Sequence, residues 1–321
     1  MGVTGCDRLR EVTAGCRAVL LSATEGEAEL LHAAMLSAER HVVASKAVYA
    51  GTLEVDHRGG GDHTAGAPAV SVVLGITGCD KANAAHLLTC LLQAMEPAPL
   101  LVLQMGVAGA LPSPGPGPSA NVGDIVLATQ EAYFDTGSSS PAGWVSAAEI
   151  GLPIACPSGR ELGGIFSLDS DLVGTAQEVI EGIEWPESAR AIVNGAGAAE
   201  VESSSKEAGS VRWPALAGRT DGRPAVLLGP CVTGSLVTGL GSEAEAIAAR
   251  FGALAESMEG AAAAHVCALY GVPFLEIRGI SNMVVDRDRD SWQVRRAAAV
   301  AGWATLAVIG ALGRLPLRRG A

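Results

Sequence analysis

The sequence has few aromatic residues and no paired cysteine motif. Phe, Tyr and Trp make up 4% of its 321 residues, although hydrophobic residues make up 49%. Small and aliphatic side chains must therefore fill the interior, which favours closely packed helices and strands. None of the seven cysteines belongs to a Cys-x-x-Cys pair. The sequence thus indicates neither a disulfide framework nor a structural zinc site, and reduced thiols in the cytoplasm are expected.

Basic clusters and long apolar runs are also missing. The chain has 34 acidic against 22 basic residues, a formal net charge of -12, and its Lys and Arg form no stripe. Nucleic acid is therefore not an expected partner. The longest uncharged apolar run, 297–312, is shorter than the ~20 residues of a membrane span. Residues 1–17 lack the continuous apolar stretch of a secretory signal, so neither membrane nor export is expected.

Short apolar runs alternate with helical patterns along most of the chain. Strands are expected at 18–22, within 41–55, and at 70–76, 100–104, 125–129, 225–232 and 274–280. Helices are expected at 29–35, 81–95, 243–251, 260–270 and 292–312. This alternation predicts the α/β class, with a central sheet and crossover helices.

The chain is long enough for one large domain with a buried core. We interpret residues 1–17 as an N-terminal extension and 18–321 as a single domain. Residues from about 184 to 223 have mixed composition and no period, which predicts a surface insertion. The Gly-rich segment 58–68 and the Pro- and Gly-rich segment 111–119 are expected to be loops.

Acidic residues follow the first expected strand. Glu25 and Glu27 come where a strand ends and a helix begins, the edge at which open α/β sheets bind ligands. The positive end of the helix dipole would favour their charged forms there. Ordinary first-turn acids that stabilise the helix start explain them as well.

Four further segments combine small and polar residues. The Gly-punctuated turn at 75–85 is a weak phosphate-site candidate, because it matches no phosphate-binding fingerprint. The small residues of the expected loop at 106–111 allow either close ligand approach or tight packing. Segments 256–262 and 276–282 place polar groups beside apolar strands, although turns also use Ser-Asn. His57 and His63 flank glycines without metal-ligand spacing, so a solvated loop is favoured and no metal or cofactor is expected.

The order of these motifs identifies a family. Gly75-x5-Lys81-x-Asn83-Ala-Ala is followed by Gly-Val-Ala-Gly-Ala-Leu, Val-Gly-Asp-Ile-Val, Ser-Met-Glu-Gly-Ala-Ala-Ala-Ala, Gly-Val-Pro-Phe and Ile-Arg-Gly-Ile-Ser-Asn. From about Val19 to Val308 the chain resembles the methylthioadenosine/adenosylhomocysteine nucleosidases of the purine nucleoside phosphorylase superfamily. Within it, Ala-Thr-x-x-Glu-Ala-Glu near the start is more similar to the futalosine hydrolases. So is Ser281-Asn282 followed by Arg287-Asp288 and Trp292.

The resemblance implies a three-layer α/β/α sandwich with a mixed, twisted central sheet, working as a homo-oligomer of two or more chains. It further implies a purine-nucleoside site. Glu259 would hold the ribose and Met258 would pack on the sugar, while Ser257 replaces a glutamate of the adenine-specific enzymes. The backbone of Val107, Ala108 and Gly109 would pass beside the sugar. Leu236 and Val237 would form a wall for the base.

Asn282 is the position that bears on the base. The adenine-specific enzymes have Ser-Asp where this chain has Ser281-Asn282. An Asp can donate a proton to N7 and accept from an exocyclic amine, whereas an Asn can donate to O6 of a 6-oxopurine and accept from protonated N7. Asn282 therefore favours hypoxanthine, the base of futalosine.

Hydrolysis is favoured over phosphorolysis, because a phosphorylase needs Arg forks and backbone donors for its phosphate dianion. No Arg or Lys occurs between Lys81 and Arg160. We expect Asn282 to stabilise the departing base and Glu27, in preference to Glu25, to activate water. Tyr133 or Arg287 is a candidate for the 5′ group of futalosine, although a surface salt bridge explains Arg287 as well. The alternatives are another purine nucleosidase, for inosine-like or 5′-thio nucleosides, and a nucleoside-binding protein without turnover.

Overall fold

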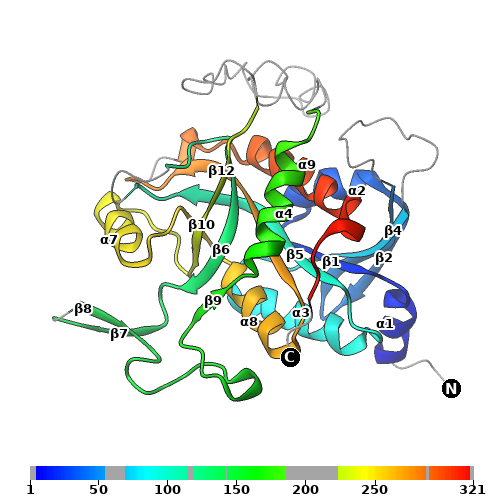
Figure 1. Cartoon of the computed structure of the whole chain (residues 1–321), viewed down its shortest axis with the longest axis horizontal. Coiled ribbons are helices and arrows are strands. Elements are labelled where there is room, and N and C mark those ends of the chain that lie inside the picture. The colour runs from blue at the N-terminus through cyan, green and yellow to red at the C-terminus, as the bar shows by residue number, and fades with distance from the viewer. Residues whose placement is uncertain are drawn as a thin grey trace.

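The computed structural model describes residues 5–54, 69–113, 119–141, 143–185, 223–286 and 289–318 (Figure 1). The strands are β1 Ala18–Ser22, β2 Met35–Val43, β3 Lys46–Glu54, β4 Ala69–Ile76, β5 Leu101–Ala110, β6 Ile125–Tyr133, β7 Gly137–Ser140, β8 Gly143–Ser146, β9 Ile165–Ser167, β10 Val226–Thr233, β11 Ala255–Ser257 and β12 Phe274–Met283. The α-helices are α1 Gly5–Thr13, α2 Glu25–Ala34, α3 Lys81–Ala94, α4 Ser170–Glu181, α7 Gly241–Phe251, α8 Gly260–Tyr270 and α9 Val294–Gly310.

One mixed sheet organises the described residues. Its strand order is β11-β10-β6-β12-β5-β1-β4-β3-β2, with β9 paired to β6. The pairs β4/β1, β1/β5 and β5/β12 are parallel, whereas β12/β6 and β2/β3/β4 are antiparallel. Because β11 also pairs with β5, strands β5, β12, β6, β10 and β11 close on themselves at one end of the sheet. The strands β7 and β8 form a separate hairpin.

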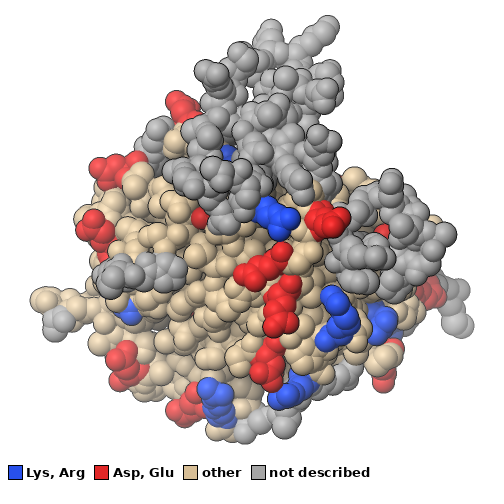
Figure 2. Space-filling view, turned by 45° about the horizontal axis from the view of Figure 1, so that its top comes forward, with Lys and Arg blue, Asp and Glu red and all other residues tan. Residues whose placement is uncertain are grey.

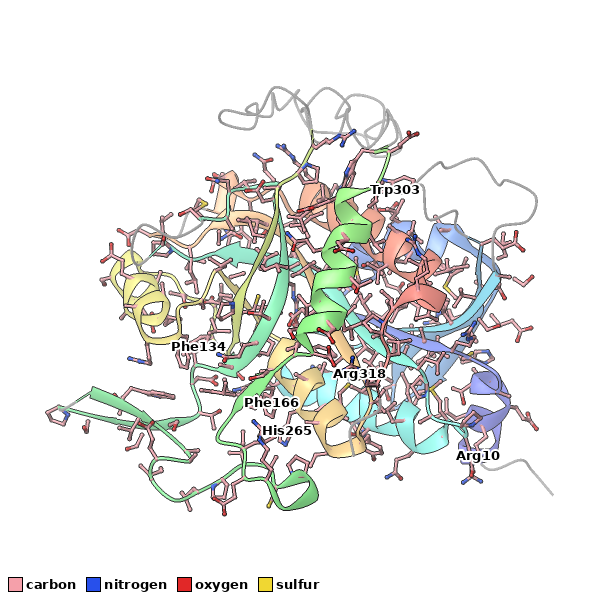
Figure 3. The ribbon with its side chains drawn as sticks, viewed as in Figure 1. Arg10, Phe134, Phe166, His265, Trp303 and Arg318 are labelled. Atoms are coloured by element: carbon pink, nitrogen blue, oxygen red, sulfur yellow. The ribbon has the colours of Figure 1, made fainter. Side chains whose placement is uncertain are left out.

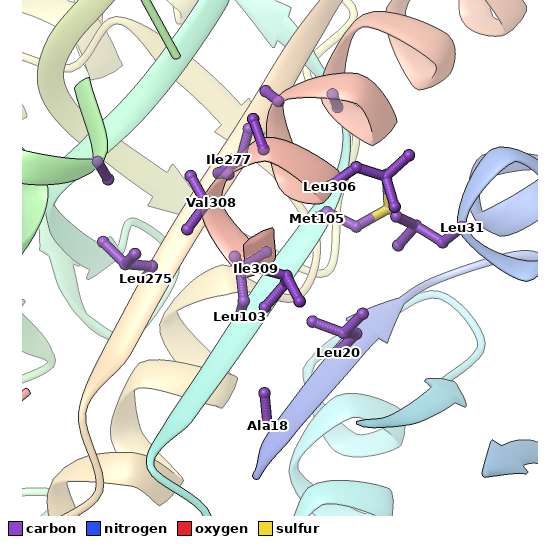
Figure 4. Close-up of a cluster of buried hydrophobic side chains, with 14 of the residues drawn as sticks. Ala18, Leu20, Leu31, Leu103, Met105, Leu275, Ile277, Leu306, Val308 and Ile309 are labelled. Carbon is purple, nitrogen blue, oxygen red and sulfur yellow. The ribbon is translucent and has the colours of Figure 1, made fainter. Parts of the chain in front are cut away.

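Helices cover both faces of the sheet, which confirms the predicted three-layer α/β/α sandwich. Along the fully buried β1, Leu20 packs into the apolar core that α2, α4 and α9 share, while Val19 packs into the core of α3 and α8. A strand buried on both faces shows a continuous apolar run rather than alternation. In Figure 4, Leu20 and Leu103 of the sheet lie beside Ile309 of α9, and Met105 lies beside Leu31 of α2.

The first helix after β1 begins earlier than expected, and this moves the acidic residues into it. The sequence predicts a helix from 29, but α2 begins at Glu25. Thr24 caps it: its Oγ1 accepts a hydrogen bond from Glu27 N, and its own backbone N–H donates to the Glu27 carboxylate. This reciprocal pair is a capping box, which satisfies two N–H groups that the helix start would otherwise leave unpaired.

The strands near the site are longer than the sequence indicates. The segment 106–110, expected to lie in a loop after a strand ending at 104, belongs to β5, and β12 continues through Ser281 and Asn282 to Met283. Small residues in β5 leave space beside the backbone, and pairing with β12 and β11 satisfies its N–H and C=O groups. The expected strand pair at 41–55 likewise starts at Met35.

The remaining sequence predictions concern charge, hydropathy and domain organisation. The described part of the face in Figure 2 has Lys and Arg interspersed with Asp and Glu rather than gathered in a stripe. In the described ranges, no helix combines the length and hydropathy that a membrane crossing requires. The expected loop at 58–68 and most of the expected insertion at 184–223 lie outside the described residues, so the division into 1–17 and 18–321 stays a prediction.

Candidate functional site

The candidate site lies where four strands end. Since β4, β1, β5 and β12 are neighbours and run parallel, their carboxyl ends meet at one edge of the sheet. The segments 24–27, 77–81, 106–110 and 278–283 therefore converge, as expected for the ligand-binding edge of an α/β sheet.

Glu27 is fixed at this edge by three donors. Its Oε2 accepts hydrogen bonds from the backbone N–H and the Oγ1 of Thr24, both at 3.0 Å. Its Oε1 accepts from Val107 N at 2.9 Å. The side chain is buried, so the capping box of α2 and the backbone of β5 together hold one carboxylate against the strand.

Gly106 makes this approach possible. A Cβ at position 106 would lie 2.7 Å from Glu27 Oε1 and 2.8 Å from Arg278 Nη1, closer than real Cβ atoms approach such groups. Gly106 pairs with Arg278 across β5 and β12. Only a residue without a side chain lets the carboxylate and the guanidinium occupy the same side of the strand.

Arg278 joins the carboxylates of the site. Its Nε donates to Glu276 Oε1 at 2.6 Å, its Nη1 to Val107 O at 3.2 Å and its Nη2 to Glu259 Oε2 at 3.4 Å. Burial opposes the charged form, but Glu276 and Glu259 outweigh it and raise the pKa of Arg278. The guanidinium is therefore permanently charged, and its N–H groups already donate to Glu276, Glu259 and Val107 O.

Glu259 lies just before α8 and also accepts a hydrogen bond from the turn that precedes α3. Positive φ angles at Gly78 (76°) and Asp80 (91°) turn the backbone so that Asp80 N donates to Glu259 Oε1 at 3.2 Å. Burial raises the pKa of Glu259, and Arg278 counteracts the rise. A backbone N–H that could have bound a phosphate oxygen thus binds a protein carboxylate.

Ser281 and Asn282 lie at a bulge near the end of β12. The register with β5 shifts between Ile280 and Asn282. Ser281 Oγ lies 3.2 Å from Ala108 O and donates to Asn282 Oδ1 at 2.8 Å, while Asn282 Nδ2 donates to Met283 O at 3.2 Å. These contacts fix the plane of the buried Asn282 amide beside the 107–109 backbone.

The segment 234–240, after β10, is hydrogen-bonded to Asp80 and Asp135 near its start and to Glu256 near its end. Ser235 Oγ donates to Asp80 Oδ1 at 3.1 Å, and Ser235 N donates to Asp135 Oδ2 at 2.9 Å. Thr238 donates through its backbone N, at 2.8 Å, and through its hydroxyl to Glu256. Between these anchors Leu236 is 69% exposed and Val237 38%, so part of their apolar surface is accessible.

Not every candidate residue joins this arrangement. Glu25 is exposed, and its Oε1 accepts from the Tyr49 hydroxyl at 2.9 Å, whereas Glu27 contacts β5. Ser257 Oγ lies 3.4 Å from Thr233 Oγ1, and Met258 is half-buried.

Of the two residues expected near a 5′ group, only Tyr133 lies in the part of the chain that the structure describes. The Tyr133 hydroxyl lies 3.3 Å from Nδ1 of His265, which stacks on Phe166 (Figure 3). Tyr133 therefore already has a partner, and its role in ligand binding stays a prediction. Arg287 lies outside the described residues.

The sequence interpretation gave no role to Asp80, Arg278, Glu276 or Glu131. One signal was available in Glu276-Ile277-Arg278. Opposite charges two residues apart in an otherwise apolar strand lie on the same face of that strand. A buried pair of this kind indicates a salt bridge between the two side chains.

Comparisons with known proteins agree with the nucleoside phosphorylase-like architecture described above. The solved nucleosidase from Neisseria meningitidis, in complex with methylthio-immucillin-A, superposes with a TM-score of 0.62 at 22% identity, covering 92% of this chain and 98% of that one. The Colwellia psychrerythraea nucleosidase, in complex with adenine, gives a TM-score of 0.64 at 19% identity, covering 96% and 98%. At these identities the likeness shows the fold.

The family assignment comes from the sequence comparison. The family model described as the phosphorylase superfamily matches residues 17–312, and the chain belongs to this superfamily.

Two curated relatives are similar to parts of this chain. The chain is 45% identical to the futalosine hydrolase of Streptomyces coelicolor over 86 residues, a segment that spans 26% of this chain and only 35% of that protein. It is 28% identical to the 5′-methylthioadenosine/S-adenosylhomocysteine nucleosidase of Staphylococcus carnosus over 213 residues, 66% and 68% of the two chains.

Proposed function

We propose that this protein hydrolyses the N-glycosidic bond of purine nucleosides and that its substrate is futalosine, from which it releases hypoxanthine. The observation that carries the proposal is that the buried carboxylates of Glu27 and Glu259 both lie close to Arg278, Glu259 through its 3.4 Å contact with Nη2 and Glu27 beside Gly106, which pairs with Arg278. Their mutual repulsion raises the pKa of Glu259 further, after burial. Two carboxylates at one sugar site suit a reaction that develops positive charge on the sugar.

Glu27 is the group that activates water. A carboxylate can accept about four hydrogen bonds, and the three donors that hold Glu27 leave one position for a water molecule. General-base assistance of this kind contributes ~10²–10⁴ in rate. Glu25 lacks such a placement, because its contact is with Tyr49.

Glu259 and the 107–109 backbone hold the sugar. The Glu259 carboxylate accepts hydrogen bonds from the 2′ and 3′ hydroxyls, and Met258 packs on the sugar face. Ser257, where the adenine-specific enzymes have a glutamate, alters one ribose contact. As the glycosidic bond lengthens, the ribosyl group becomes oxocarbenium-like, and a buried negative charge nearby lowers the energy of that state.

Asn282 recognises the leaving base. Its Nδ2 donates one proton to Met283 O, so its second proton is available to O6 of hypoxanthine. Its Oδ1 accepts from Ser281 and has a second lone pair for N7–H of the departing base. Leu236 and Val237, exposed between two anchors, cover the base.

Phosphorolysis is disfavoured by the same contacts. Arg278 is shared among Glu276, Glu259 and Val107 O, and Asp80 N binds Glu259. A phosphate dianion in this position would also face the Glu27 carboxylate. Like charges at short range repel strongly in a site with little water.

The longer alignment with the Staphylococcus carnosus nucleosidase supports a second candidate, a nucleosidase for 5′-thio nucleosides. In either case we propose a cytoplasmic homo-oligomer with no cofactor. Tyr133 and Arg287 are the proposed contacts for a 5′ group.

Incubation of the purified protein with single nucleosides tests the proposal. Futalosine, inosine, methylthioadenosine and aminodeoxyfutalosine are supplied in phosphate-free buffer, and the released base is followed by chromatography. Rapid hypoxanthine release from futalosine alone is expected. Adenine release would overturn the role of Asn282, and absence of any release would overturn the hydrolytic function.

A further inference from the structure

A second carboxyl pair lies behind the site, outside the groups that the proposed reaction uses. Glu131 of β6 and Glu276 of β12 are both fully buried. Thr233 Oγ1 donates to Glu131 Oε2 at 2.9 Å, and Arg278 Nε donates to Glu276 Oε1 at 2.6 Å. Each carboxyl group therefore has one satisfied oxygen.

The second oxygen of each carboxyl group lies near the other carboxyl group. Glu131 Oε1 and Glu276 Oε2 are buried and have no donor among the described residues. A side chain at Gly260 would collide with both carboxyl groups, which places them together over the first residue of α8. Two buried carboxylates without a donor between them would be costly, whereas one proton between them supplies the missing hydrogen bond.

The charges around Arg278 lead to the same conclusion. Glu27, Glu131, Glu259 and Glu276 are four buried acids that interact with this one guanidinium. A neutral Glu131 removes one negative charge from this group. Its surroundings favour neutrality, since burial and the charge of Glu276 raise its pKa well above the usual range.

We propose that Glu131 and Glu276 share one proton, carried by Glu131, and that the charged Glu276 positions Arg278 so that Glu259 remains a strong acceptor for the ribose hydroxyls. The second half of this inference rests on the proposed function. Glu276 draws the guanidinium to 2.6 Å, and Glu259 receives only a 3.4 Å contact. Without the charge on Glu276, Arg278 moves toward Glu259 and competes with the substrate hydroxyls.

Other titratable groups face the pair from the neighbouring strands. The Cys231 thiol of β10 has its pKa raised by burial and then by the charge of Glu276, so it stays neutral. Burial also raises the pKa of Tyr133 of β6. Neither supplies charge near neutral pH, and among the described residues Arg278 and Glu259 are charged groups that respond to the pair.

Infrared difference spectroscopy tests the shared proton without any substrate. A protonated carboxyl group has a C=O stretch that a carboxylate lacks. Near neutral pH, Glu131→Gln is expected to remove one such band from the spectrum of the intact protein. Glu245→Gln, the same replacement at an exposed site on α7, should leave the band. If Glu131→Gln removes no band, the proposal is wrong even if the protein is an active nucleosidase.

Kinetics test the positioning role. Glu276→Gln is expected to lower kcat/KM for nucleoside hydrolysis at least about tenfold, equivalent to about 1.4 kcal/mol. It should also move the acidic limb of the kcat/KM profile to lower pH, since Glu276 contributes to the raised pKa of Glu259. Glu131→Gln keeps Glu276 charged and should cost less and leave the limb in place. An unmoved limb in a folded Glu276→Gln variant would refute the positioning role.

Discussion

Substituting Gly106 by alanine perturbs the centre of the site with a single methyl group. The added Cβ would lie 2.7 Å from Glu27 Oε1 and 2.8 Å from Arg278 Nη1, so both side chains must move by several tenths of an ångström or more. Neither can move freely, because Glu27 is held by the capping box and Arg278 by Glu276.

The magnitude follows from the contacts that are lost. Overpacking of a buried position typically costs about 1–3 kcal/mol, and a hydrogen bond to a charged group, such as Val107 N to Glu27, contributes about 1.5–3 kcal/mol. Since 1 kcal/mol shifts the Tm of a domain of 150–250 residues by roughly 2–4 °C, a loss of several degrees is expected. Displacing Glu27 by about 1 Å should lower kcat on the order of 10²-fold.

Base release by chromatography and thermal unfolding measure the two effects. Gly174→Ala is the matched control: Gly174 lies within α4, and no heavy atom approaches within 4 Å of the added Cβ. That variant should keep full activity and gain up to about 1 kcal/mol, because alanine is the better helix former. A Gly106→Ala enzyme with the kcat of the unchanged protein would refute the placement of Glu27.

Three further predictions concern single residues. Glu27→Gln should lower kcat by about 10²–10⁴, while Glu25→Gln should stay within a few-fold, as steady-state kinetics on the same substrate can show; equal losses would contradict the choice between them. Asn282→Asp should shift the ratio of kcat/KM values from hypoxanthine toward adenine nucleosides, and an unchanged ratio would remove Asn282 from base recognition. The pKa of Glu131 in the folded protein is raised above its ordinary value of 4.5. Between that value and the raised pKa, the folded protein therefore binds more protons than the unfolded chain. The free energy of unfolding should fall as the pH rises through this range. Melting curves across pH should show a flatter profile for Glu131→Gln.

The sequence predicts the architecture well where the apolar pattern is continuous. The run Ala18–Ser22 is a strand with the expected bounds, and Lys81 begins α3 as expected. The predictions are wrong in extent where glycine interrupts a strand. Gly106 and Gly109 suggest a loop, but β5 continues through them, because pairing with β12 and β11 compensates for their weak intrinsic preference.

The site is predicted in outline but not in its connections. The motifs indicate Glu27, Glu259 and Asn282, and the structure places them at the edge where β1, β5 and β12 end. The role of Arg278 depends on contacts with Glu276 and Glu259, and Glu131 meets Glu276 beside Gly260, the first residue of α8. Distances of this kind depend on tertiary pairing, which no local pattern encodes.

The sugar product is the most direct test of the central claim, that Glu27 directs water rather than phosphate at this site. The protein is incubated with nucleoside and abundant inorganic phosphate, and the sugar is identified by mass spectrometry and phosphorus NMR. If Glu27 directs water, the product is a free sugar, formed at a rate that is independent of phosphate and that falls by about 10²–10⁴ in Glu27→Gln. A sugar 1-phosphate product would contradict it.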